Sequence, residues 1–169
     1  MNSLIQKPSS KRQGITLLDL ILTISVMGVM AAVAVPKMTD AHQSYQLQVT
    51  SRMLSQTINQ VRETAIHQSC WQSVTFNLED EICTAVGIAD PDHPTQQFEF
   101  DCKEQSSVLD LATVSLTNSS LTLYYNHYGV PMVDTSGTVL TTNGEITMTN
   151  GTQTQTIIID QQTGIARVL

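Results

Sequence analysis

The chain has 169 residues, 41% of them hydrophobic, and carries eight Lys/Arg against fifteen Asp/Glu, a formal net charge of −7. This length allows one domain of ordinary size beside a membrane segment. The acidic balance does not favour nucleic-acid binding, because neutralising phosphates requires clustered Lys and Arg.

An apolar run follows a short basic leader. The twenty-one residues from Ile15 to Val35 contain one charge, Asp19, and Pro36 closes the run. At about 1.5 Å per residue, a helix of this length crosses the roughly 30 Å core of a bilayer. The positive-inside rule keeps the leader in the cytoplasm and sends the remainder outside. The basic residues of the leader are Lys7, Lys11 and Arg12.

The junction Gly14-Ile15-Thr16-Leu17-Leu18-Asp19-Leu20 resembles the class III signal of type IV pilins and of type II secretion pseudopilins. This resemblance implies that a prepilin peptidase cuts after Gly14 and methylates the new N-terminus at Ile15. The apolar segment is then retained as the packing core of a filament. The resemblance also implies that Asp19 pairs with the N-terminal amine of the neighbouring subunit and sets the axial register. The family usually has Glu at this position; Asp is one methylene shorter, so pairing with its own amine is the alternative.

Two other interpretations of the apolar run stay open. In the first, the run is an ordinary secretory signal peptide with Ala32-Val33-Ala34 as the cleavage site. Its length and the charge of Asp19 argue against this, since signal peptides have apolar cores of about 7–15 residues. In the second, the run is a plain membrane anchor in which Asp19 is incidental, although a charge inside a bilayer is costly and usually functional.

The helix is expected to begin near Thr16 and to continue well past the membrane. Residues 37–69 contain neither Gly nor Pro, and apolar residues recur there at helical spacing. This stripe consists of Leu47, Leu54, Ile58, Val61 and Ala65. Pro36 is expected to kink the helix where the membrane ends.

From Trp71 onward the pattern favours strands and turns. Glu79-Asp80-Glu81 is expected to be an acidic turn and Ala89–Gln97 a loop, while Val108–Leu116 is ambiguous. The pair Asn143-Gly144 predicts a hairpin between Val139–Thr142 and Glu145–Thr149. The other predicted strands are Val74–Phe76, Ile82–Ile88, Phe98–Asp101, Leu121–Asn126, a central and doubly covered Thr156–Ile159, and Ile165–Leu169 after a turn at Gly164.

Three cysteines lie in the part expected to be exported. Where thiols are oxidised, three cysteines give one disulfide and one odd thiol. Cys83 and Cys102 would face each other if residues 82–88 and 96–101 form a hairpin, so these two are the predicted pair. Cys70, beside Trp71, is then expected to be a buried thiol.

A helix with one apolar stripe needs a sheet to cover it, which predicts an α+β domain. The resemblance implies the same, a pilin-like fold with a long N-terminal helix packed on antiparallel sheet. The expected organisation is a cleaved leader (1–14), a transmembrane half-helix (15–36), an amphipathic half-helix (37–69) and a β-rich periplasmic head (70–169). Further on, Tyr124-Tyr125, Gly129-Val130-Pro131, Gly137-Thr138-Val139 and Ile157–Arg167 resemble the C-terminal pattern of the GspH/FimT subgroup of minor pilins and pseudopilins.

The sequence predicts no enzyme, cofactor or metal site. It contains no metal-binding His or Cys motif and no phosphate-binding Gly loop. The favoured function is a minor pseudopilin of a type II secretion system, and the alternatives are a minor pilin of a type IV pilus or a DNA-binding pilin that uses Arg167. The implied partners are the prepilin peptidase, major and minor (pseudo)pilins and an assembly platform. The implied location is the bacterial inner membrane, with one pass, a cytoplasmic N-terminus and a periplasmic head that is drawn into the filament.

Overall fold

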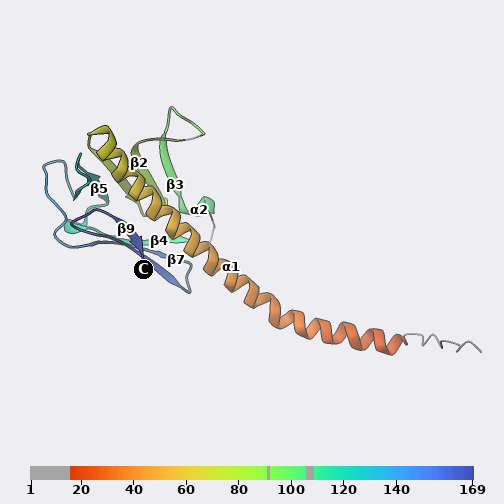
Figure 1. Ribbon diagram of the computed structural model, residues 1–169. Helices are drawn as coiled ribbons and strands as arrows, with labels where there is room; N and C mark the ends of the chain where they lie inside the picture. Colours follow the sequence, from red (N-terminus) through yellow and green to blue (C-terminus); the bar gives the residue numbers. More distant parts are fainter. Residues whose placement is uncertain (1–15, 91, 106–108) are drawn as a thin grey trace, which may run out of the picture. The chain divides into compact units, whose positions relative to one another are not determined.

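The computed structural model describes residues 16–90, 92–105 and 109–169 (Figure 1). Gly14 and Ile15 therefore lie outside the described residues. The chain divides into two compact units, residues 1–40 and 41–169. One helix, α1 (Leu17–Gln68), belongs to both units, and its start agrees with the beginning predicted near Thr16.

The first half of α1 is apolar and has no cover of its own. Every described side chain from Thr16 to Ala34 is exposed. The helix continues through Pro36. The kink expected at that residue stays a prediction.

The second half of α1 packs on the head through the predicted stripe. All five stripe residues are at most 2% exposed, which confirms the one-sided pattern. These side chains join one apolar core with residues of both sheets, and Figure 1 shows this half of α1 lying against the strands. The stripe residues are Leu47, Leu54, Ile58, Val61 and Ala65.

The head contains two antiparallel sheets, as the α+β prediction requires. The five-stranded sheet has the order β3-β2-β1-β5-β6, and the four-stranded sheet has the order β4-β7-β8-β9. The strands of the first are β1 (Gln72–Asn77), β2 (Ile82–Ala89), β3 (Gln97–Asp101), β5 (Thr122–Tyr125) and β6 (Pro131–Met132). The strands of the second are β4 (Asp110–Ser115), β7 (Gly144–Thr149), β8 (Thr154–Ile159) and β9 (Ala166–Val168). Two short helices, α2 (Cys102–Gln105) and η1 (Thr117–Ser119), connect them.

The hairpin predicted about Asn143-Gly144 is wrong. Strand β7 pairs with β4 and β8, whereas the segment before it makes only an isolated bridge between Val139 and Met132 among the described residues. Gly144 is the first residue of β7 and is buried, so it does not form a turn. The turn lies instead at Asn150-Gly151, where Gly151 has φ +84° and Asn150 Oδ1 accepts hydrogen bonds from the Thr152 and Gln153 N–H groups.

Strand β8 is interior, as predicted, but only one of its faces is fully covered. It pairs with β7 on one side and with β9 on the other. Ile157 and Ile159 are fully buried, whereas Ile158 between them is partly exposed. The run of β-branched residues therefore reflects strand propensity, and burial alternates along it as in a half-covered sheet.

Polar side chains of α1 attach the helix to β9. Asn59 Nδ2 donates to the Ala166 carbonyl at 3.0 Å, and the Ala166 N–H donates to Asn59 Oδ1 at 2.9 Å. Ser55 Oγ donates to the same carbonyl at 3.0 Å. Arg62 Nε donates to the Thr163 carbonyl at 2.7 Å. These bonds occupy both backbone groups of Ala166, so β9 is held by β8 on one side and by α1 on the other.

Candidate assembly site

The membrane-length helix begins with a reciprocal cap. Thr16 precedes the first helical residue, and the Asp19 N–H donates to its Oγ1 at 3.2 Å. In return, Asp19 Oδ2 accepts from the Thr16 N–H at 3.2 Å and from the Thr16 hydroxyl at 2.9 Å. This is a capping box, in which two backbone donors of the first turn are satisfied by two side chains.

The capping box gives Asp19 a defined local role. Its negative charge lies in the first turn, where the helix dipole favours an anion. Both bonds from Thr16 use Oδ2, and a carboxylate has a second oxygen, Oδ1, that can accept from another donor. The cationic N-terminus predicted at Ile15 would lie next to Thr16. Asp19 can thus serve the helix start of its own chain and still offer an acceptor to an amine.

The remainder of the exposed half-helix suits a lipid environment. Among the described residues, α1 is the one helix long and apolar enough to cross a membrane, and its apolar window is fully exposed. Its two hydroxyl residues bond within the helix: Thr23 Oγ1 donates to the Leu20 carbonyl and Ser25 Oγ to the Ile21 carbonyl, both at 2.8 Å. An apolar face of this size needs lipid or other helices around it.

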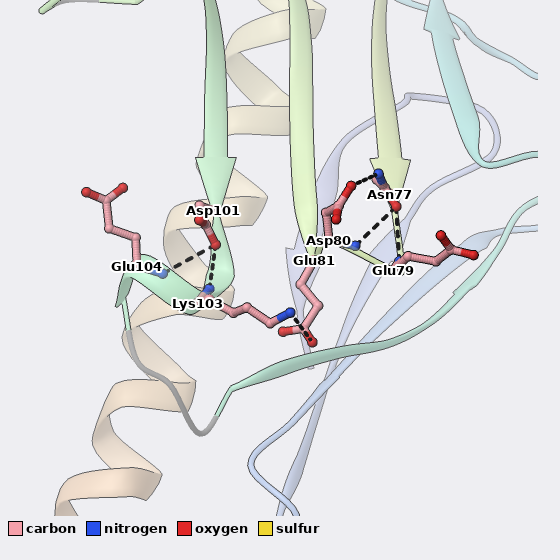
Figure 2. A network of polar contacts seen from close by, with 7 residues as sticks. All are labelled: Asn77, Glu79, Asp80, Glu81, Asp101, Lys103 and Glu104. Atoms are coloured by element: carbon pink, nitrogen blue, oxygen red, sulfur yellow. Dashed lines mark hydrogen bonds and ion pairs between the residues drawn. The ribbon is translucent and has the colours of Figure 1, made fainter.

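A polar network lies at one end of the β1–β2–β3 strands (Figure 2). In the acidic turn between β1 and β2, Asn77 Oδ1 accepts from the Glu79 and Asp80 N–H groups, and Asn77 Nδ2 donates to Asp80 Oδ2 at 2.7 Å. Glu81, with φ +60°, ends the turn. Its Oε1 lies 3.2 Å from Lys103 Nζ, and its Oε2 is buried without a hydrogen-bond partner among the described residues. The predicted acidic turn is therefore stabilised by hydrogen bonds between its own residues and Asn77.

Five carboxylates line a hollow of about 260 Å³ next to this network. They belong to Asp90, Asp92, Glu99, Asp101 and Glu104. Within the described residues, no group of three or more His, Cys, Asp or Glu side chains has a geometry that could hold a metal ion. Asp101 Oδ1 instead caps α2, accepting from the Lys103 N–H at 2.7 Å and from the Glu104 N–H at 3.3 Å.

The three cysteines occupy two different environments. Cys83 and Cys102 are both 0% exposed. All three cysteines are unbridged in this structure, and the disulfide predicted between Cys83 and Cys102 stays a prediction. Burial, followed by the negative charges of Glu81 and Asp101, raises the pKa of Cys102 to about 12. Burial, followed by the charge of Cys102, raises the pKa of Cys83. Cys70, predicted to be buried, is partly exposed beside an exposed Trp71, because α1 ends at Gln68 and the chain turns at the surface there.

The basic residue considered for nucleic-acid binding has an acidic neighbour. Arg167 is exposed on β9, and its charge helps to lower the pKa of Asp160. The larger cause of that lowered pKa is hydrogen bonding from Thr163. A single cation close to a carboxylate gives little of the phosphate attraction that dominates DNA affinity.

Sequence reasoning identified Asp19 but missed its partner. The order Thr16-Leu17-Leu18-Asp19 before an apolar run is the sequence signature of a capping box, with Asp in place of Glu. That signal was present in the chain. The attachment of Asn59 to Ala166 had no comparable local signal, since the two residues are 107 positions apart.

This chain is similar to known proteins in structure but not in sequence. The sequence matches no known family model and none of the curated proteins. Among solved structures, the minor pseudopilin EpsH from the type 2 secretion system of Vibrio cholerae is 15% identical, with a TM-score of 0.52 over 73% of this chain and 96% of that one. The type IV minor pilin FimU of Pseudomonas aeruginosa is 12% identical, with a TM-score of 0.50 over 75% of this chain and 88% of that one. The long helix on antiparallel sheets is therefore a pilin-like α+β fold.

Proposed function

We propose that this chain is a minor pseudopilin, a structural subunit of the periplasmic pseudopilus of a type II secretion system. The observation that carries the proposal is the start of α1: an exposed, membrane-length apolar helix that opens with an acid in a capping box. The pilin-like fold of the head supports it. The head would be carried on this helix and would perform no catalysis.

In this proposal the chain is processed before it assembles. Prepilin peptidase removes residues 1–14 by cutting between Gly14 and Ile15, and Ile15 is then methylated. Residues 15–36 stay in the inner membrane with the head on the periplasmic side. The assembly platform then draws the helix into a filament with the major and minor pseudopilins.

Asp19 is the residue proposed to direct assembly. Its Oδ2 is held by Thr16, and Oδ1 would accept a hydrogen bond from the N-terminal amine of a neighbouring subunit. A buried carboxylate and a buried cation are each costly alone and tolerable as a pair. Asp is shorter than Glu, and the capping box fixes it close to the helix start. The partner's amine would therefore have to approach the first turn closely.

The first experiment is N-terminal sequencing of the membrane-bound protein from cells with and without a prepilin peptidase. We expect a mature start at Ile15 that disappears without the enzyme. A start at Val35 in both strains would instead identify an ordinary signal peptide cut after Ala34 and would overturn the proposal.

The second experiment measures assembly. The Asp19→Asn variant should be cleaved normally but should recover less of the major subunit in pulldowns, because the amide lacks the negative charge. A matched control is Asp40→Asn, which removes one acid from the same helix outside the apolar run. Equal recovery by wild type and Asp19→Asn would contradict the role given to Asp19.

The alternative is a minor pilin of a type IV pilus, and the likeness to FimU favours it about as much as the likeness to EpsH favours the pseudopilin. Pulldowns against the major subunits of both systems distinguish the two, since only the cognate subunit should be recovered. A DNA-binding pilin is the third hypothesis. Arg167 lies near Asp160, so we expect no gel shift of DNA even at low salt.

A further inference from the structure

Two buried thiols of the head lie on one face of the β2–β3 hairpin. The register pairs Cys83 with Phe100 and Ile82 with Asp101, and the Cys102 N–H donates to the Glu81 carbonyl at 3.2 Å. Directly paired residues point to the same face of a sheet, as do residues two apart along a strand. Cys83, Phe100 and Cys102 therefore share the core face, with Cys102 diagonal to Cys83.

The diagonal position is close to the spacing that a disulfide needs. Diagonal neighbours in antiparallel sheets are about 7–8 Å apart, and bridged cysteines have Cα atoms up to about 6.8 Å apart. Strand β3 ends at Asp101, and Cys102 is the first residue of α2. The Cα atoms of Cys83 and Cys102 therefore need to approach each other by about 1 Å. This approach falls where the chain leaves the hydrogen-bonded ladder of β2 and β3.

We propose that Cys83 and Cys102 form a disulfide after the head leaves the cytoplasm and before the core closes over them, and that Cys70 remains a free thiol. The cellular timing rests on the export in the proposed function. In the reaction both Sγ–H bonds are lost and one Sγ–Sγ bond forms. The two electrons and two protons pass to the disulfide of a thiol oxidase outside the cytoplasm, whose Sγ–Sγ bond breaks to give two thiols.

The order of events follows from burial. Thiol–disulfide exchange requires a thiolate that can reach the attacked sulfur. In the folded head both thiols are 0% exposed, and burial keeps them protonated at neutral pH. Exchange is therefore fast only while the hairpin has formed and α1 has not yet packed on it. Cys70 is partly exposed, and its sulfur contacts the side chains of Gln68 and Gln72.

The thiols are counted on the full chain, taken from membranes and denatured without reductant in the presence of a polyethylene-glycol maleimide. We expect one modified thiol in the wild type, none in Cys70→Ser, and two in either Cys83→Ala or Cys102→Ala. Three modified thiols in the wild type would refute formation of the disulfide in cells. One in the wild type with none in Cys83→Ala would show that Cys70 and Cys102 are the pair, which also refutes it.

A second measurement separates this proposal from the proposed function. The purified chain is reduced, unfolded and refolded in detergent with a glutathione redox couple, where export plays no part. One free thiol after refolding but three in cells would mean that the head is not exported. Three in both samples would refute the disulfide itself. For the timing, the folded reduced protein should oxidise at least tenfold more slowly than the refolding chain, and equal rates would refute the order of events.

Discussion

Replacing Asn59 with Ala should weaken the attachment of β9 to the helix. The amide of Asn59 bonds to both the N–H and the carbonyl of Ala166, at 2.9 and 3.0 Å. Ser55 Oγ also donates to that carbonyl, so the carbonyl keeps a partner in the variant. The N–H does not, and Ala166 is only 3% exposed, so water reaches it poorly.

The magnitude follows from these two bonds. A buried donor left without a partner costs about 1–3 kcal/mol, and the loss of a second, compensated hydrogen bond adds about 1 kcal/mol. The free energy of unfolding should therefore fall by about 2–4 kcal/mol. For a domain of this size each kcal/mol corresponds to roughly 4 °C, so the melting temperature should fall by about 8–16 °C.

The assay is thermal unfolding of the full chain in detergent, followed by near-ultraviolet circular dichroism of Trp71 and the tyrosines. Thr64→Ala is the matched control, because Thr64 is partly exposed on the same helix and its hydroxyl bonds back to the Gln60 carbonyl. That variant should change stability by less than about 0.5 kcal/mol. If Asn59→Ala melts at the same temperature as Thr64→Ala, Asn59 does not attach β9.

Three further predictions concern a turn, a carboxylate and the helix start. Gly164 has φ +70°, and a Cβ there would lie 2.6 Å from the Gly129 carbonyl oxygen. Gly164→Ala should therefore strain the backbone and lower the free energy of unfolding, measured by urea titration, by about 1–3 kcal/mol. A variant as stable as wild type would contradict this strain. Hydrogen bonds from Thr163 lower the pKa of Asp160 below its ordinary 3.8. The stability that the Asp160 carboxylate contributes is therefore complete above pH 3.8 and is lost as the pH falls through the pKa of the folded state. Asp160→Asn should flatten the loss of stability below about pH 4, and an unchanged pH profile would contradict this contribution. Thr16→Val removes the side-chain cap of α1, which costs about 1 kcal/mol of helix stability. Hydrogen exchange at the amide of residue 19 should therefore become about fivefold faster. Thr16→Ser keeps the capping hydroxyl and should match wild type.

The long helix and its buried stripe could be predicted because they depend on local pattern. Spacings of three, four and seven residues determine which side chains share a helix face, and all five predicted stripe residues are in the core. The hairpin of β2 and β3 was predictable for the same reason, since the loop between the strands is short and rich in turn residues. The reciprocal bonds of Thr16 and Asp19 are equally local.

Pairings that depend on distant residues could not be predicted. Asn-Gly permits a tight turn at residues 143–144, but β7 pairs instead with β8, across the local turn at Asn150-Gly151, and with β4. Of these two pairings, the one with β4 is long-range. The exposure of Cys70 depends on where α1 ends relative to the sheet. The spacing of apolar residues along the helix does not determine that end. The side chains of α1 that bind β9 are polar residues in an otherwise amphipathic helix, and only the fold gives them partners.

The attachment of β9 also sets when the head can fold. Asn59 and Ala166 are separated by 107 residues, so both sheets between them must be synthesised before the bond can form. Until then the polar side chains of α1 that bind β9 lack their partner. A chain interrupted within those 107 residues would leave Asn59 and Ser55 without their partner on β9. The bond that stabilises the finished head thus also distinguishes a finished chain from an interrupted one.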